Sequence, residues 1–237
     1  MEKFKSFVQN SYRDYIIKFS LAVKDTHVKN NFGEVDVFIP KQETNQKNKL
    51  ITSGLQGDEP AGPMALLKWV QSNKEASNIF FIPILSAESY INKTHFDNSG
   101  KNVNLQIPNN PAYEIKELLN SNQLQKMSSG GYLSCQEDSN RDESYLIVWK
   151  HNEKLVQDFL EILGDNFKIR NNSKLVLGPG VFGANIKDNT TLGNYCAKLG
   201  APVSITIETP VINTTIAKRV DAQVSMITKF VEYDGKF

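Results

Sequence analysis

The sequence predicts a single α/β domain, in which a mixed and mostly parallel central sheet is flanked by helices. Short apolar runs alternate along the chain with segments of helical periodicity, which is the first indication of this fold class. Ile79–Leu85 is almost continuously apolar, as expected for an interior strand covered on both faces. A length of 237 residues, 40% of them hydrophobic, suits one domain with a sizeable core.

The composition excludes several classes of protein. A net charge of +1 provides no basic field for nucleic acid. Cys135 and Cys196 are too few for a disulfide scaffold, and we expect both to be buried and reduced. No uninterrupted apolar segment suits a signal peptide or a membrane span. The expected localisation is therefore cytoplasmic.

The first element expected is a helix. Aromatic and aliphatic residues recur at helical spacing through residues 4–16, and they predict an N-terminal helical extension over residues 1–30. Val35–Ile39 then alternates in polarity and stops at Pro40, as a strand does. The polar segment Gln42–Asn48 is expected to form a loop.

The stretch around residue 55 combines a strand, a tight turn and the start of a helix. Leu50–Ser53 suits a short buried strand, Gly54–Gly57 supplies the turn, and Pro60 suits the first helical turn. Such a frame lifts side chains to the edge of an α/β sheet. Gln56 and Glu59 lie three residues apart across the turn, so both can aim at one point. With His at position 56 they would form half of a zinc site.

The remaining elements follow from periodicity and from turn residues. Residues 86–110 are polar and rich in Asn, which predicts a long loop. The expected inner face of the helix after Pro60 consists of Met64, Leu66, Leu67 and Val70, and that of the last helix consists of Ile216, Val220, Val224, Ile227 and Val231. The other expected elements are a helix from Pro111, a strand Gly130–Cys135, a charged loop Gln136–Ser144, a helix His151–Leu163, a strand Leu175–Leu177, a loop Pro179–Asn189, a helix Leu192–Leu199, a strand Val203–Glu208 and a helix Asn213–Val231.

Three strings that carry carboxylates lie at the ends of predicted strands: residues 56–59, 135–139 and 207–210. Ligands bind at such strand ends in α/β sheets, although ordinary turn and cap chemistry is the alternative. Glu208 is the strongest candidate for a functional carboxylate, because it ends an apolar strand and is followed by a turn with Pro210. A carboxylate there would be partly desolvated, which raises its pKa toward general acid/base use.

Two other signals favour structural roles. Gly178–Gly183 matches a dinucleotide-binding pattern, but no clear helix follows it, so a plain loop is the preferred interpretation. The three histidines, His27, His95 and His151, are scattered, and each is expected to be a surface or core-edge imidazole.

In their order along the chain these strings resemble the motifs of the zinc metallocarboxypeptidases, especially the small bacterial murein-peptide amidases. Gly54–Gly62 reproduces that family's GxHGDEPAG motif except for its His, and Thr206–Pro210 resembles the string of the catalytic glutamate. Gln136–Ser139 resembles the family's H-E-D-S loop. Pro83–Ser89 and His95–Leu105 match more weakly. The resemblance extends from about residue 33 to residue 231.

The resemblance implies a zinc carboxypeptidase-like fold over residues 1–237 and zinc as the cofactor. It assigns three positions to the metal, and these are Gln56, Glu59 and Gln136. It assigns the role of general base and acid to Glu208. Asn104 would help to hold the substrate carboxylate, and His95 would polarise the scissile carbonyl. Arg141 is an alternative replacement electrophile in the same region.

The chain departs from the family at four of its functional positions. Gln56 and Gln136 replace the two ligand histidines, and an amide oxygen is a weaker donor to zinc than an imidazole. His95 and Leu105 replace two arginines, so a bidentate clamp for a carboxylate is lost. One hypothesis is a degenerate peptidase-fold protein, a pseudoenzyme that binds a peptide or peptidoglycan fragment with weak or no zinc-dependent cleavage.

The alternative is an active metal-dependent carboxypeptidase or amidase that acts on peptidoglycan-type peptides. It would use an atypical Gln-Glu-Gln site, with Glu208 as the general base. The replaced ligands leave open whether zinc is bound or the site is empty. Neither hypothesis involves nucleic acid or a membrane span.

Overall fold

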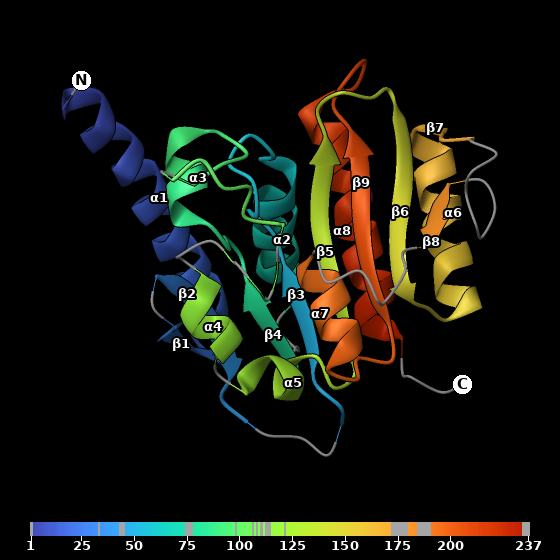
Figure 1. The fold of residues 1–237 in the computed structure, drawn as a ribbon, viewed down its shortest axis with the longest axis horizontal. Coiled ribbons are helices and arrows are strands. Elements are labelled where there is room, and N and C mark those ends of the chain that lie inside the picture. Colours follow the sequence, from blue (N-terminus) through green and yellow to red (C-terminus); the bar gives the residue numbers. More distant parts are fainter. Residues whose placement is uncertain are drawn as a thin grey trace.

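The computed structural model describes residues 2–32, 34–42, 46–73, 78–97, 99–105, 107, 109, 111, 115–120, 122–171, 180–183 and 191–233, with side chains from residue 12 onward. Within these residues nine strands form a mixed sheet with the order β1-β2-β4-β3-β5-β9-β6-β7, and β8 pairs with β6 (Figure 1). The strands are β1 (His27–Phe32), β2 (Val35–Pro40), β3 (Lys49–Thr52), β4 (Ile79–Ile82), β5 (Gly131–Asp138), β6 (Glu143–Lys150), β7 (Lys168–Ile169), β8 (Val181–Gly183) and β9 (Ser204–Pro210). Most pairings are parallel, and the predicted fold class is confirmed.

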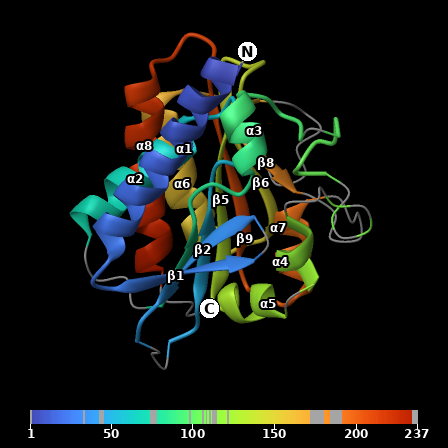
Figure 2. The same ribbon diagram turned by 90° about the vertical axis from the view of Figure 1, so that its left-hand side faces the viewer.

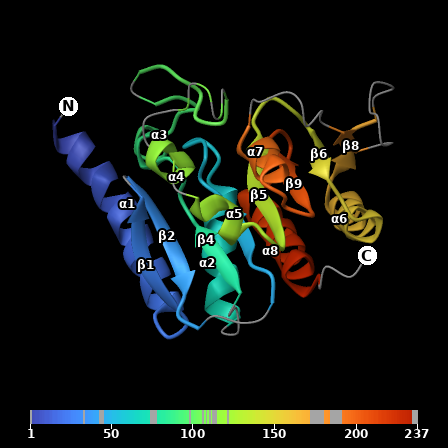
Figure 3. The same ribbon diagram turned by 60° about the horizontal axis from the view of Figure 1, so that its bottom comes forward.

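Helices cover both faces of this sheet. The helices are α1 (Glu2–Val23), α2 (Ala61–Ser72), α3 (Ala87–Asn92), α4 (Lys116–Asn120), α5 (Gln123–Met127), α6 (Glu153–Asn166), α7 (Leu192–Lys198) and α8 (Ile216–Glu232). Figure 2 shows α1, α2, α6 and α8 on one side of the sheet and α4, α5 and α7 on the other. Figure 3 shows α1 and α6 toward opposite ends of the sheet.

Because both faces are covered, the interior strands bury alternate side chains into two separate cores. In β4, Phe81 packs with α1 and α2 around Trp69 in one hydrophobic cluster. Its neighbours Phe80 and Ile82 belong to the second cluster, under α4, α5 and α7. The almost continuous apolar character of β4 therefore has a direct cause, since neither face of the strand contacts solvent.

Three parallel strands end at the same edge of the sheet. β3, β5 and β9 pair side by side, and their carboxyl ends lie toward the top of Figure 1. The register places Gln136 of β5 opposite Glu208 of β9. The antiparallel strand β6 then places Tyr145 on the other side of Glu208.

Glycine is required at Gly57, in the turn between β3 and α2, and at Gly62, in the first turn of α2. A Cβ atom on Gly57 would overlap the carbonyl group of Ser89 in α3. A Cβ atom on Gly62 would lie 2.5 Å from the carbonyl oxygen of Cys135 in β5. These close backbone approaches hold the turn against α3 and hold α2 against the sheet.

Several sequence predictions need correction, because pairing across the sheet overrides local polarity. The expected helical extension to residue 30 ends at Val23, and His27–Phe32 pairs with β2 as an edge strand. The segment predicted as a charged loop, residues 136–144, is mostly strand, because β5 continues beside β9 as far as Asp138 and β6 begins at Glu143. The predicted loop 86–110 contains α3, whose first turn is capped by the Ser86 hydroxyl.

The predicted inner faces of two helices are rotated from the observed ones. In α2, Met64 is exposed while Trp69 is buried. In α8, Ile216 is exposed, while the polar residues Arg219 and Gln223 are buried. Hydrophobicity alone misplaced the face of α8, because Arg219 and Gln223 have partners on the sheet. The predicted strand Leu175–Leu177 lies outside the described residues, as do seven of the eleven residues of the predicted loop Pro179–Asn189.

The dinucleotide-like string is described only in its second half. Gly180 adopts a positive φ of 77°, and Val181–Gly183 forms β8 beside β6. Gly178 and Pro179 lie outside the described residues. Among the helices of the described residues, none is long and apolar enough to cross a membrane.

Lys49 fixes the end of α8 to the start of β3. The side chain is buried, and its ammonium group donates hydrogen bonds to the carbonyl oxygens of Phe230 at 2.9 Å and Val231 at 2.7 Å, and to that of Tyr233. The last carbonyls of a helix have no partner within the helix, and a cation there also opposes the negative end of the helix dipole.

We expect Lys49→Met to lower the free energy of unfolding by about 2 kcal/mol, because the buried carbonyl oxygens lose a charged donor. Urea denaturation monitored by circular dichroism measures this change. Lys68→Met is the matched control, because the exposed pair between Lys68 and Asp221 should contribute less than about 0.5 kcal/mol. Equal effects of the two substitutions would contradict the role of Lys49.

Candidate functional site

The strand ends and the adjacent loops enclose a polar cavity of about 160 Å³, which we call the acidic pocket. Gln56, Glu59, Gln136 and Glu208, to which the resemblance assigns the metal and the general base, all line this pocket. His95 and Asn104 also line it. The full lining is Gln56, Glu59, His95, Asn104, Gln136, Glu137, Asp138, Ser139, Asn140, Tyr145 and Glu208.

Amide side chains occupy one side of the acidic pocket. Gln136 donates from Nε2 to the Ser134 hydroxyl at 2.8 Å and accepts at Oε1 from Asn104 Nδ2 at 3.4 Å. Gln56 donates from Nε2 to Asn102 Oδ1 at 3.4 Å. The amide of Gln136 therefore uses both its donor and its acceptor, whereas that of Gln56 uses its donor.

Two buried carboxyl groups occupy the other side. Glu59 is 3% exposed, and its Oε2 accepts a hydrogen bond from the backbone N–H of Glu137 at 3.2 Å. Burial raises the pKa of Glu59 well above its usual value, and the nearby Glu208 raises it further. Glu208 is 7% exposed, and burial, with the charges of Asp138 and Glu137, raises its pKa to about 8.

Glu137 is a residue that the sequence analysis did not single out, although it lies within one of the carboxylate strings. It is buried, and its Oε2 accepts from the backbone N–H of Ala61, at the start of α2, at 2.7 Å. Its Oε1 pairs with the buried Arg219 of α8. Burial raises the pKa of Glu137, while the Ala61 N–H and the Arg219 guanidinium oppose that rise.

Gln223, four residues after Arg219, strengthens the same junction. Its Nε2 donates to the backbone carbonyl of Gln136 at 3.0 Å and to the Thr209 hydroxyl at 2.8 Å. The signal in the sequence was the placement of Arg219 and Gln223 at i, i+4 in line with the apolar Met226 and Phe230. Polar residues on an otherwise apolar helix face require partners inside the protein.

His95 and Arg141 were the alternative candidates for a replacement electrophile. His95 lines the acidic pocket, with Nδ1 2.6 Å from Asp58 Oδ2 and Nε2 3.8 Å from Glu59 Oε1. Arg141 is not among the lining residues, and its Nε pairs with Asp138 Oδ2 at 3.0 Å. The Tyr145 hydroxyl donates to the same Asp138 oxygen at 2.7 Å. Arg141 is therefore engaged in holding Asp138.

The donor set at the three predicted metal positions does not fit zinc. Gln56 and Gln136 supply neutral amide groups, and Glu59 supplies one carboxylate, whereas zinc sites in proteins are built from His, Cys and carboxylate ligands. Within the described part of the chain, no three His, Cys, Asp or Glu side chains are grouped so that they could hold a metal ion. We therefore derive no chemical step through a metal.

The remaining histidines and cysteines have no contact with the acidic pocket. His27 is buried and bonds through Nε2 to the Ile79 carbonyl at 2.8 Å, and burial lowers its pKa. His151 is exposed. Cys135 and Cys196 are buried free thiols, as predicted, and burial raises the pKa of each to about 12.

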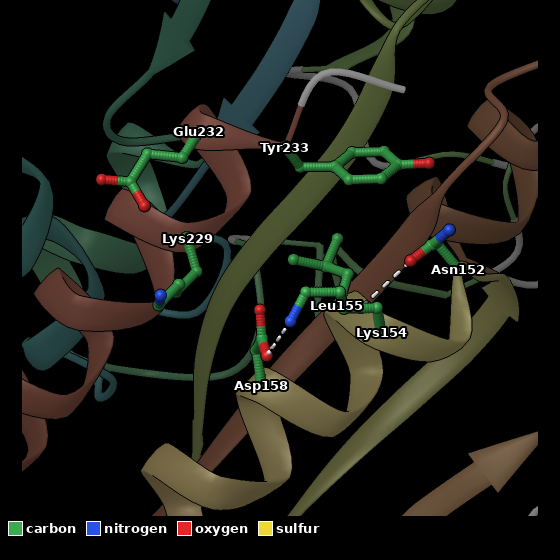
Figure 4. A pocket seen from close by; sticks show the side chains of 7 residues that line it. All are labelled: Asn152, Lys154, Leu155, Asp158, Lys229, Glu232 and Tyr233. Atoms are coloured by element: carbon green, nitrogen blue, oxygen red, sulfur yellow. Dashed lines mark hydrogen bonds and ion pairs between the residues drawn. The ribbon is translucent and has the colours of Figure 1, made fainter. Parts of the chain in front are cut away.

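A second hollow, of about 390 Å³, lies between α6 and α8 (Figure 4). Its polar side chains have ordinary structural roles. Asn152 caps α6 by accepting from the backbone N–H of Leu155, and Lys154 pairs with Asp158 at 3.1 Å. Such caps and surface pairs suit helix ends, so we place no functional site here.

Comparisons with known proteins identify the fold. No protein-family model matches the chain, and no significant match is found among curated proteins. Solved structures do match. A protein from Shewanella denitrificans, provisionally described as a metallopeptidase, has a TM-score of 0.85 at 21% identity, over 96% of this chain and 91% of that protein.

Two better-described structures share the architecture at lower identity. A metallo-carboxypeptidase from Burkholderia cenocepacia has a TM-score of 0.66 at 11% identity, over 90% of this chain and 66% of that protein. One from Pseudomonas aeruginosa, in complex with (2-guanidinoethylmercapto)succinic acid, has a TM-score of 0.64 at 12% identity, over 91% of this chain and 67% of that protein. The chain therefore has the fold of the metallo-carboxypeptidases, as the resemblance of its motifs predicted. At these identities the likeness shows the fold alone.

We expect Arg219→Met to lower the free energy of unfolding by about 3–5 kcal/mol, because Glu137 would be left as an uncompensated buried charge. Arg219→Lys, which keeps the charge but loses the planar fork, should cost less. Urea denaturation measures both changes. The double variant Arg219→Met, Glu137→Gln should be more stable than Arg219→Met alone. If the changes in the free energy of unfolding of the two single variants simply added up in the double variant, the two residues would not be coupled.

The raised pKa of Glu208 predicts a pH-dependent stability. The unfolded chain releases this proton near pH 4.5, whereas the folded protein holds it until about pH 8, so stability falls as the pH rises between these values. Glu208→Gln should match the native protein at pH 4 and be more stable by about 4 kcal/mol at pH 8.

Urea denaturation in the presence of a chelator, at both pH values, tests this expectation. The control is Glu161→Gln, the same change at an exposed position of α6, which should leave the pH dependence unaltered. An unchanged slope of stability against pH in Glu208→Gln would contradict the burial of an ionisable carboxyl at this position.

Proposed function

We propose that this protein binds a peptide or peptidoglycan-fragment ligand in the acidic pocket and has lost efficient zinc-dependent cleavage. Gln56 and Gln136, which take the positions of ligand histidines in the resemblance, carry this proposal. Both are held by hydrogen bonds to other side chains of the site, so the amides are integrated into a network of their own.

The choice of ligand class rests on the fold and on what the site retains. Asn104, which the resemblance assigns to the substrate, lies at the cavity. A relative in fold binds a small acid that carries a guanidino group, which supports a small polar ligand at this edge of the sheet. The volume of the pocket, about 160 Å³, suits one polar group of such a ligand and not the whole ligand.

The alternative function is hydrolysis of peptidoglycan-type peptides by an atypical metal-dependent site. Glu208 favours it, because a buried carboxyl with a pKa of about 8 can hold and release a proton near neutral pH. Such a group costs stability, and a purely structural role does not require it. Glu208 would carry the proton, and His95 would lie beside the reacting carbonyl.

Metal analysis combined with a cleavage assay separates the two functions. We expect purified native protein to contain far less than one zinc per chain and to leave muropeptides intact. The double substitution Gln56→His and Gln136→His should raise the affinity for zinc by at least about tenfold, because imidazole is the better donor. Isothermal titration with zinc measures that affinity.

Gln71→His, at an exposed position of α2, controls for non-specific binding by an added imidazole. Stoichiometric zinc in the native protein, together with muropeptide cleavage that Glu208→Gln abolishes, would establish the hydrolase and overturn the binding function.

A further inference from the structure

The carboxylates around the acidic pocket differ in whether they have a counter-charge. Glu137 pairs with Arg219, and Asp138 pairs with Arg141 at 3.0 Å. Asp58 takes the short contact with His95, at 2.6 Å. Two acids remain, Glu59 and Glu208. Among the described residues, the one basic nitrogen within 4 Å of either carboxyl group is His95 Nε2, 3.8 Å from Glu59 Oε1.

Glu208 is the more exceptional of the two remaining acids. The side chain lines the cavity, and its residue is more than nine-tenths buried, being 7% exposed. No described residue donates a hydrogen bond to its carboxylate or forms an ion pair with it. Buried carboxylates normally have such partners, so this oxygen pair is open to a donor from a ligand.

Neighbouring groups add further acceptors around the same cavity. Gln56 is also 7% exposed, and its bond to Asn102 uses Nε2, which leaves Oε1 as an acceptor. Glu59 uses Oε2 for the backbone N–H of Glu137, which leaves Oε1. The pocket therefore offers carboxyl and amide oxygens, and no Lys or Arg is among its described lining residues.

We propose that this pocket recognises the primary ammonium group of its ligand, through Glu59, Glu208 and the amide oxygen of Gln56. The inference rests on the proposed binding function and names the ligand group that enters the pocket. An ammonium has three donors and no acceptor, which complements a cluster of acceptors. Hydrogen bonds between an ammonium and carboxylates in a desolvated cavity are short and strong.

Two competing ligand groups fit less well. A carboxylate would face Glu59 and Glu208 without an arginine clamp, and Leu105 stands where the resemblance has one of its two arginines. A metal ion requires ligand oxygens within about 2.0–2.6 Å, and the described acids show no such grouping. An ammonium tolerates the wider spacing of ordinary hydrogen bonds, about 2.7–2.9 Å.

Apolar side chains lie next to the lining residues. Phe96 and Leu105, which directly follow His95 and Asn104, are 48% and 45% exposed. The Phe96 ring centroid lies 6.3 Å from that of His95, and an exposed apolar ring beside a polar pocket suits a ligand whose charged group is attached to an apolar body. Amino-terminal residues of peptides and lysine-type side chains both have this character.

Isothermal titration in the presence of a chelator tests the proposal with three probes. Leucine amide presents an α-ammonium, Nα-acetyllysine amide presents a side-chain ammonium, and N-acetylleucine presents a carboxylate alone. We expect one of the two ammonium probes to bind at least about tenfold more tightly than N-acetylleucine. The tighter of these two identifies the source of the ammonium group.

Glu208→Gln and Glu59→Gln should each weaken the tighter ammonium probe by at least about tenfold, because a charged hydrogen bond is lost. Thermal denaturation verifies that both variants fold, and Glu161→Gln on α6 should bind as the native protein does. Tighter binding of N-acetylleucine, no binding of either ammonium probe, or binding unaffected by Glu208→Gln would overturn the proposal.

Two further measurements separate this inference from the proposed function. Mass spectrometry of peptides incubated with the protein detects cleavage, and cleavage with retained ammonium binding would overturn the binding-only function but not the ammonium site. Titration with Mg²⁺ and Zn²⁺ without chelator is the other measurement. Tight metal binding that excludes the ammonium probes would overturn the ammonium site.

Discussion

The geometry of the site depends on the interactions of one buried residue, Glu137. It accepts a hydrogen bond from Ala61, at the first turn of α2, and it pairs with Arg219 of α8. Its own backbone N–H donates to Glu59. One residue at the end of β5 thus joins a strand, two helices and the turn that carries Gln56, and this arrangement fixes the position of the acidic pocket.

The frame of the site and its chemistry are subject to different constraints. Gly57 and Gly62 are fixed by close backbone approaches to α3 and β5, which no side chain can replace. Gln56, in the turn after β3, and Gln136, near the end of β5, instead line a cavity, where a different polar side chain can be accommodated by new hydrogen bonds. Amides can therefore stand at these positions while the fold of the metallo-carboxypeptidases persists.

Burial without a counter-charge makes Glu59 and Glu208 costly to the folded state. Their pKa values are raised chiefly by desolvation, and the charge of Glu208 raises the pKa of Glu59 further. A ligand with a positive charge and hydrogen-bond donors would compensate the desolvation of these two carboxyl groups. This compensation would contribute to the binding free energy. Proteins commonly concentrate such unfavourable groups where they bind or react.

The sequence by itself determined the fold class and the strand–turn–helix frame, because apolar runs and turn residues are local patterns. The order of its motifs along the chain, through the resemblance, implied that Gln56, Glu59, Gln136 and Glu208 lie together. Only the tertiary structure decided that residues 136–138 and 143–150 are strands and that Arg219 faces inward. These features depend on partners distant along the chain. Pairing with β9 stabilises polar residues as strand, and the Glu137 carboxylate makes the burial of an arginine favourable.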